Sequence, residues 1–147
     1  MHKSLASHLL VSLQFITIGI GLVPWAGSPQ GSPAWLWLSV PGSLIAVYTL
    51  THNRLGNFAI YPEPLTQARL VTSGPYRRVR HPMYLALFLL MSGIAAWNGT
   101  WYNLASLPVL LIAIFGKMQR EERYLRERFA DYADYCHRCK RLIPFIY

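Results

Sequence analysis

The chain has 147 residues, of which 53% are hydrophobic and only 14% are charged, and its formal net charge is +8. This length fits a single domain, and so apolar a composition excludes an ordinary soluble domain. The positive charge does not predict a nucleic-acid partner, because the basic residues are segregated between long apolar runs. We therefore predict one membrane-embedded domain over residues 1–147.

The first two apolar runs have the length of membrane-spanning helices. Residues 5–23 would cover about 28 Å as a helix, close to the thickness of the hydrocarbon core, and we expect this segment to be retained as a first span. Residues 34–50 begin with two tryptophans, as an interfacial anchor does. Pro41-Gly42 in the middle of this run predicts a kink.

The third and fourth apolar runs are shorter and lie close together in the chain. They cover residues 82–97 and 101–116, and Asn98-Gly99 between them is a turn signal. This spacing predicts a helical hairpin whose tip lies at the membrane surface. The predicted fold is therefore all-α, with about four transmembrane helices.

The distribution of basic residues predicts the orientation of these spans. Loops 24–33 and 97–101 contain no Lys or Arg, whereas segment 51–81 contains five and the tail after Gly116 contains eight. The positive-inside rule then places both termini and the middle segment in the cytoplasm. Because the chain is so compact, we expect an integral protein of a prokaryotic cytoplasmic membrane.

The tail 117–147 has helical periodicity and predicts a cytoplasmic amphipathic helix that continues from the fourth span. Glu121 and Glu122 border the face of this helix that should be buried. Salt bridges along the helix, from Glu122 to Arg126 and from Glu121 to Lys117, are one explanation of the two glutamates. A functional site is the other, because the tail and the basic middle segment share one side of the membrane. The predicted buried stripe is Met118, Glu122, Leu125, Phe129, Tyr132 and Cys136.

The segment 73–84 has the composition of a binding site. It places three arginines, a histidine and two tyrosines directly before an apolar run. Pro82 fixes its own φ and disfavours the α region for His81, so a helix should begin at Pro82. Arg80 and His81 then lie just outside a helix start, where free backbone N–H groups favour an anionic ligand group.

Three motifs in this order resemble the membrane-embedded isoprenylcysteine carboxyl methyltransferases and the related phospholipid methyltransferases. They are Gly74-Pro75-Tyr76, Arg80-His81-Pro82-Met83-Tyr84 and Glu121-Glu122-Arg123-Tyr124-Leu125, and the resemblance covers residues 57–147. It implies methyl transfer from S-adenosylmethionine to a lipophilic small-molecule or prenylated acceptor. The cofactor would enter from the cytosol and the acceptor from the membrane lipid.

Matching positions in the family imply the residues of the site. Lys117 falls where eukaryotic members place a residue that contacts the substrate. The charges agree with such a site, because a sulfonium and an ammonium suit carboxylates and aromatic faces, and the cofactor's own carboxylate suits Arg80 or the helix start at Pro82. The predicted catalytic residues are Arg80, His81 and Glu122, with His81 as the base if the acceptor is an amine. The cofactor-binding residues that the resemblance implies are Leu70, Val71, Tyr76, His81, Pro82, Met83, Tyr84 and Glu121.

Other readings of the sequence remain open at this point. The acceptor could be a prenylcysteine carboxylate, the amine of phosphatidylethanolamine or a small thiol. A sterol-reductase-like NADPH enzyme is an alternative, because such enzymes have an ending similar to segment 135–147. A non-enzymatic membrane protein that binds anionic lipid would explain the charge but would leave the paired glutamates without a role. Cys136-His137-Arg138-Cys139 lacks a fourth ligand for zinc, so no metal site is predicted.

Overall fold

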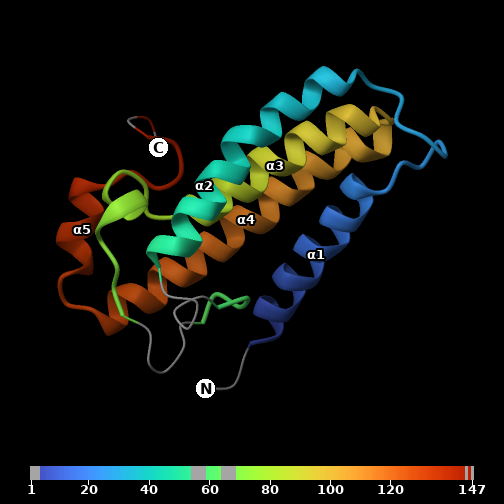
Figure 1. The fold of residues 1–147 in the computed structure, drawn as a ribbon. Helices are drawn as coiled ribbons and strands as arrows, with labels where there is room; N and C mark the ends of the chain where they lie inside the picture. The colour runs from blue at the N-terminus through green and yellow to red at the C-terminus, as the bar shows by residue number, and fades with distance from the viewer. Residues whose placement is uncertain (1–3, 54–58, 64–68, 145, 147) are drawn as a thin grey trace.

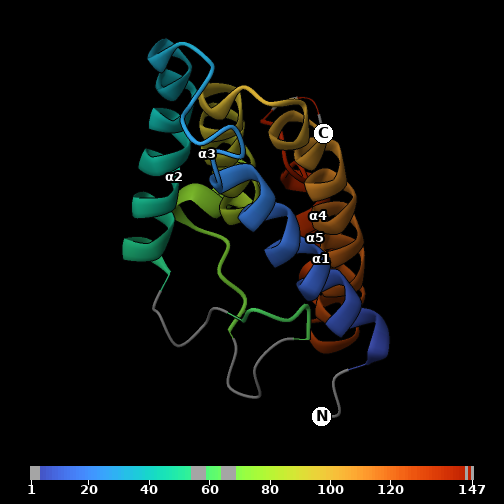
Figure 2. The same ribbon diagram turned by 90° about the vertical axis from the view of Figure 1, so that its right-hand side faces the viewer.

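The computed structural model describes residues 4–53, 59–63, 69–144 and 146, and within these ranges the regular structure is entirely helical. Four long helices lie side by side as a bundle, and α5 lies against one end of it (Figures 1 and 2). The elements in chain order are α1 (Leu5–Leu22), the 3-10 helix η1 (Pro33–Leu38), α2 (Ser39–His52), the 3-10 helix η3 (Gly74–Arg77), α3 (Pro82–Asn98), α4 (Trp101–Arg128) and α5 (Tyr132–Arg138).

The two ends of the bundle differ in what they carry. The start of α1, the η3 loop and α5 lie at one end, and the α3–α4 turn lies at the other (Figures 1 and 2). The basic middle segment and the tail thus meet at the same end of the bundle. The candidate site is built there.

Within the described ranges, three helical segments are long and apolar enough to cross a membrane. They are α1, the continuous stretch Pro33–His52 and α4, whereas α3 is apolar but has only 17 residues. The prediction of a helical membrane protein is confirmed at this level. The predicted number of four spans would require the shorter α3 to cross as well.

Helix α4 passes without a break from the predicted fourth span into the tail, so the predicted continuation of that span beyond residue 116 is present as far as Arg128. It continues for 28 residues to Arg128, which is about 42 Å and longer than a hydrocarbon core. The chain then breaks at Phe129, whose extended backbone separates α4 from the short α5. The predicted single amphipathic helix is therefore two helices, although its stripe is correct: Met118, Glu122 and Tyr132 are buried.

The packing of α2 against α3 explains a second difference. Pro41 lies in the first turn of α2, just after the 3-10 helix η1 passes into the α-helix. Gly42 faces α3 so closely that a Cβ atom there would lie 2.7 Å from the backbone oxygen of Ala86. Pro41-Gly42 therefore marks the start of α2 and a close helix contact, a role that the sequence prediction of a kink did not include.

Two buried asparagines close the far end of the bundle. The Asn98 amide donates to the carbonyls of Gly21 and Leu22, at 2.8 and 3.0 Å. The Asn103 amide donates to Ile20 and Val23, at 2.8 and 2.9 Å. These bonds satisfy the last carbonyls of α1, which otherwise would be costly to bury. Gly99, with φ of 73°, ends α3 in the left-handed conformation that the turn requires.

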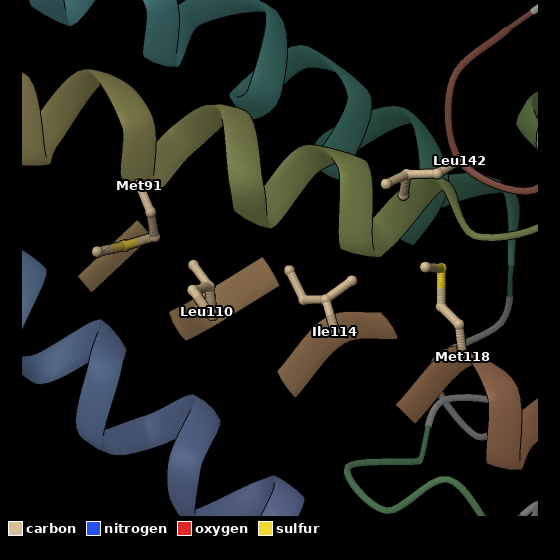
Figure 3. Close-up of a cluster of buried hydrophobic side chains, with 5 residues drawn as sticks. All are labelled: Met91, Leu110, Ile114, Met118 and Leu142. Carbon is tan, nitrogen blue, oxygen red and sulfur yellow. The ribbon is translucent and has the colours of Figure 1, made fainter. Parts of the chain in front are cut away.

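A row of apolar side chains fills the interface between α3 and α4. Figure 3 shows Met91 of α3 and three residues of α4, with Leu142 from the C-terminal segment at the end of the row. All five side chains are buried. Leu142 thus anchors the segment after α5 to the bundle core, next to the candidate site. The three α4 residues of this cluster are Leu110, Ile114 and Met118.

Candidate active site

The C-terminal segment fixes the backbone of the Arg80-His81 motif. The Arg80 N–H donates to the Lys140 carbonyl at 2.8 Å, and the His81 N–H donates to the Arg141 carbonyl at 3.1 Å. The Lys140 N–H in turn donates to Arg78, so the two segments pair in parallel around Val79. Residues 60 positions apart in sequence therefore hold the motif in place before α3 begins.

Glu122 is the buried centre of an ionic cluster and is only 1% exposed. Its Oε1 atom lies 3.0 Å from Arg80 Nε, 3.1 Å from His81 Nε2 and 3.1 Å from Arg141 Nε. Its Oε2 atom accepts from Arg141 at 3.1 Å and from Arg126 at 3.4 Å. A buried carboxylate requires such partners, and here the protein itself provides all of them. Glu122 therefore joins the motif, α4 and the C-terminal segment.

Arg80 extends this cluster to α5. Its guanidinium also donates to the backbone carbonyls of Cys136 and Cys139, at 3.1 and 2.5 Å. Partial burial acts to lower the pKa of Arg80, but the neighbouring Glu122 carboxylate outweighs it, and the pKa is raised above its usual value. Arg80 is a fixed positive charge that holds three segments together.

Glu121 points to a different neighbourhood from Glu122, because successive residues on a helix are about 100° apart. The Tyr84 hydroxyl donates to Glu121 Oε2 at 3.0 Å, and His81 Nδ1 lies 3.9 Å from the same atom. The Glu121 side chain is 33% exposed. His81, which is buried, thus stands between the two glutamates. Glu121 is the member of the pair whose carboxylate is accessible to a ligand.

Tyr76 is held by α2 on one side and by α5 on the other. The Asn53 amide donates to the Tyr76 hydroxyl at 3.0 Å, while the Tyr76 carbonyl accepts from the Tyr135 hydroxyl at 2.7 Å and from Cys139 Sγ at 3.1 Å. Burial raises the pKa of Tyr76 to about 12. Its phenol is therefore neutral at physiological pH. Gly74 begins this turn with φ of 60°, where a side chain would also collide with His52.

Lys117 lies one helical turn before Glu121 and is only 3% exposed. Its ammonium donates to Gln14 Oε1 of α1 at 2.5 Å and lies 5.4 Å from the centre of the Tyr84 ring. A buried ammonium needs such an acceptor and benefits from an aromatic face. Lys117 thus connects α1 to the predicted site.

The other predicted residues are placed as follows. Leu70 packs with Tyr132, Tyr135 and Cys139 and so contacts α5. Val71 is partly buried in the same loop, Pro82 is the buried first residue of α3 and Met83 is partly buried beside it. The structure brings five predicted residues into direct contact with one another: Arg80, His81, Tyr84, Glu121 and Glu122.

Several residues of the site were missed from the sequence. Arg141 makes two bonds to Glu122, but nothing in the tail distinguishes it from seven other basic residues. Asn53 likewise lacks a distinctive signal. Gln14 could have been found, because an amide within an apolar run requires a partner inside the bundle.

The two cysteines are reduced and belong to the packing around Tyr76. Cys139 is buried, and burial raises the pKa of its thiol. It donates to the Tyr76 carbonyl, and Cys136 packs nearby against Tyr132. In the part of the chain that the structure describes, no three His, Cys, Asp or Glu side chains are arranged to hold a metal ion.

Two metal-resistance proteins are similar to this chain over most of its length. It is 28% identical over 144 residues to the cobalt-zinc-cadmium resistance protein CzcN of Cupriavidus metallidurans, covering 97% of this chain and 64% of that protein. It is 27% identical over 112 residues to the nickel-cobalt-cadmium resistance protein NccN of Alcaligenes xylosoxydans xylosoxydans, covering 74% of this chain and 52% of that protein. The chain thus spans about half to two thirds of the length of these relatives.

The sequence profile of one family covers α2, α3 and α4 and the motifs of the site that they carry. Residues 34–132 match the phospholipid methyltransferase family. This range extends from η1 through the Arg80-His81 motif to the start of α5, and it includes Glu121 and Glu122. The recognition of this family from the three motifs is confirmed, and the chain belongs to the phospholipid methyltransferase family.

Proposed function

We propose that the chain is an S-adenosylmethionine-dependent methyltransferase that acts on a lipophilic acceptor at the membrane, similar to isoprenylcysteine carboxyl O-methyltransferases. The observation that carries this proposal is that the two adjacent glutamates differ in their partners and in their accessibility. Glu122 is neutralised by arginines within the protein, whereas Glu121 is accessible beside Tyr84 and His81. An accessible carboxylate next to aromatic rings suits a ligand that carries positive charge.

The chemistry of these donors fits the cofactor. Glu121 would hold its ammonium group, and the rings of Tyr76 and Tyr84 would lie near its sulfonium. Arg80 is engaged with Glu122, so the N-terminus of α3 at Pro82 is the better place for the cofactor's carboxylate. Once bound there, S-adenosylmethionine supplies an electrophilic methyl group. The proposed cofactor-binding set remains Leu70, Val71, Tyr76, His81, Pro82, Met83, Tyr84 and Glu121.

The protein's own contribution is positioning and the exclusion of water. Arg80 and Glu122 contact each other and the ring of His81, so we assign them a positioning role. His81 is the member of the predicted catalytic set that faces Glu121. Because its ring is buried, it helps to keep water from the reacting groups.

Lys117 supports an acceptor that carries negative charge. Its ammonium is buried between α1, α3 and α4, one turn from Glu121. A carboxylate acceptor would be attracted by this charge and would require no base, whereas a protonated amine would be repelled. We therefore place Lys117 on the acceptor side of the site.

Phospholipid N-methylation is the second candidate, and the family match over residues 34–132 favours it. An amine acceptor must lose a proton, and His81 is the base that the site offers. The two candidates differ in the acceptor, so assays with radiolabelled S-adenosylmethionine and either a prenylcysteine analogue or phosphatidylethanolamine distinguish them. The first acceptor should be labelled and the second should not.

The cofactor site is tested by calorimetric titration of the detergent-purified protein with S-adenosylhomocysteine. We expect binding that is lost in Glu121→Ala and retained in Glu127→Ala, which removes an exposed carboxylate from the same helix. Binding of NADPH in place of S-adenosylhomocysteine would contradict the proposal and favour a reductase. Equal binding by both variants would remove Glu121 from the site.

A further inference from the structure

A strongly basic pocket of about 420 Å³ opens between α4, α5 and the C-terminal segment. Its lining has five cationic side chains and one carboxylate, so it carries a net charge of +4 if His137 is neutral. The pocket shares Arg80 and Glu122 with the ionic cluster, but none of the proposed cofactor-binding residues is among the described residues of its lining, so it lies beside the proposed cofactor site. The charged residues of the lining are Arg80, Glu122, Arg126, Arg138, Lys140 and Arg141.

Among the described residues, one carboxylate lines the pocket against five cationic side chains. Glu122 offers a single negative charge to three arginines. Arg138 donates to the backbone carbonyl of Asp134, which leaves its charge in place, and Lys140 is exposed. A concave surface with excess positive charge attracts anions and repels metal cations. The pocket therefore suits an anion, although Cys136 and Cys139 also line it.

The depth of the pocket relative to a membrane indicates where the anion would come from. Glu122 lies about 32 Å along α4 from Trp101, and Arg126 about 38 Å, at a rise of roughly 1.5 Å per residue. Trp101 and Tyr102 are exposed at the other end of α4, as interfacial aromatic residues are. With Trp101 at one interface, the pocket lies just beyond a hydrocarbon core of about 30 Å. Lipid phosphates occupy that depth.

We propose that this pocket binds a phosphate group, with the headgroup of an anionic phospholipid as its principal source. Guanidinium groups match phosphate oxygens in geometry as well as in charge, and Arg126, Arg138 and Arg141 come from three different segments. A phosphate bound there would link α4, α5 and the C-terminal segment. The binding does not depend on methyl transfer, and the lipid held here is not the methyl acceptor.

The test uses the full chain in a neutral detergent. Calorimetric titrations with short-chain phosphatidylglycerol and with inorganic phosphate separate a lipid source from a soluble one. The double variant Arg138→Gln/Lys140→Gln removes two lining charges, and Arg77→Gln/Arg78→Gln removes two exposed charges outside the pocket. Arg126→Gln is a second pocket variant. Thermal unfolding and S-adenosylhomocysteine binding are measured for every variant to show that the fold and the cofactor site are intact.

We expect one-site binding of phosphatidylglycerol that weakens by about tenfold or more in the pocket variants and by less than about twofold in the control. Inorganic phosphate could instead bind more tightly than phosphatidylglycerol, with the same weakening in the pocket variants. That result would support a phosphate site that is filled from solution. The proposal is overturned if neither probe binds, if the control loses as much as the pocket variants, or if S-adenosylhomocysteine displaces the probe. Failure of the proposed methyltransferase function would appear separately, as absence of S-adenosylhomocysteine binding.

Discussion

At the scale of single residues, the two adjacent glutamates illustrate how position on a helix decides chemistry. The sequence placed both at the border of the buried face, and a helix salt bridge explained one of them. The Glu122–Arg126 pair does exist at 3.4 Å, but it is the longest contact of that carboxylate. Glu122 is buried among arginines from distant segments, whereas Glu121 contacts Tyr84 and remains accessible. Of the two, only Glu122 should matter for the stability of the fold.

We predict that Glu122→Gln lowers the free energy of unfolding by roughly 3–5 kcal/mol, the usual cost of removing one partner from a buried ionic cluster. The substitution keeps the shape but leaves Arg80 and Arg141 without their counter-charge. Glu121→Gln should change stability by less than about 1 kcal/mol, because its carboxylate is partly exposed. Thermal and denaturant unfolding in detergent measure both. Equal decreases in the free energy of unfolding of the two variants would contradict the different roles assigned to Glu121 and Glu122.

At the scale of helices, small residues decide how closely neighbours approach. Gly42 of α2 lies against the α3 backbone, and Ser39 Oγ donates to the Leu90 carbonyl at 2.9 Å. Helices in a membrane gain little from hydrophobic burial against each other, so close packing and such bonds stabilise their contacts. The sequence could not distinguish a close helix contact at Gly42 from a kink, because either one explains a Pro or Gly within an apolar run.

We predict that Gly42→Ala destabilises the bundle by about 1–3 kcal/mol, because the new methyl group overlaps the backbone of α3. Gly19→Ala is the matched control, since a Cβ atom there meets nothing within 4 Å. It should be neutral or stabilise α1 by up to about 1 kcal/mol through the higher helix propensity of alanine. The temperatures of thermal unfolding compare the two variants. A loss of the same size at Gly19, where no contact is made, would contradict the assignment of the Gly42 effect to the contact with α3.

At the scale of the whole molecule, the C-terminal segment completes the site. It pairs with the backbone of the Arg80-His81 motif, provides Arg141 to Glu122 and inserts Leu142 into the core between α3 and α4 (Figure 3). The backbone contacts join the C-terminal segment to residues about 60 positions earlier, in the middle of the chain. The site is therefore a product of the complete fold and is not contained in the motif-bearing loop.

We predict that a chain ending at Cys139 keeps its helical content but loses S-adenosylhomocysteine binding, because the motif loses its pairing partner and Glu122 loses Arg141. Circular dichroism and calorimetry measure the two properties. Ile143→Ala is the control, since that side chain is 43% exposed, and it should bind normally. A truncated chain that binds the ligand as tightly as the full chain would show that the loop forms the site without the tail.

The sequence by itself determined the helical membrane class, the family and five of the residues that meet in the site. Hydropathy, the Pro82 helix start and the order of the three motifs depend on local chemistry, so they can be read along the chain. Only the tertiary structure decided that the tail helix breaks at Phe129, that Glu121 and Glu122 have different partners and that Arg141 and Gln14 reach the site. Such contacts depend on how distant segments pack, and a buried charge selects its partners by geometry, which residue type alone does not specify.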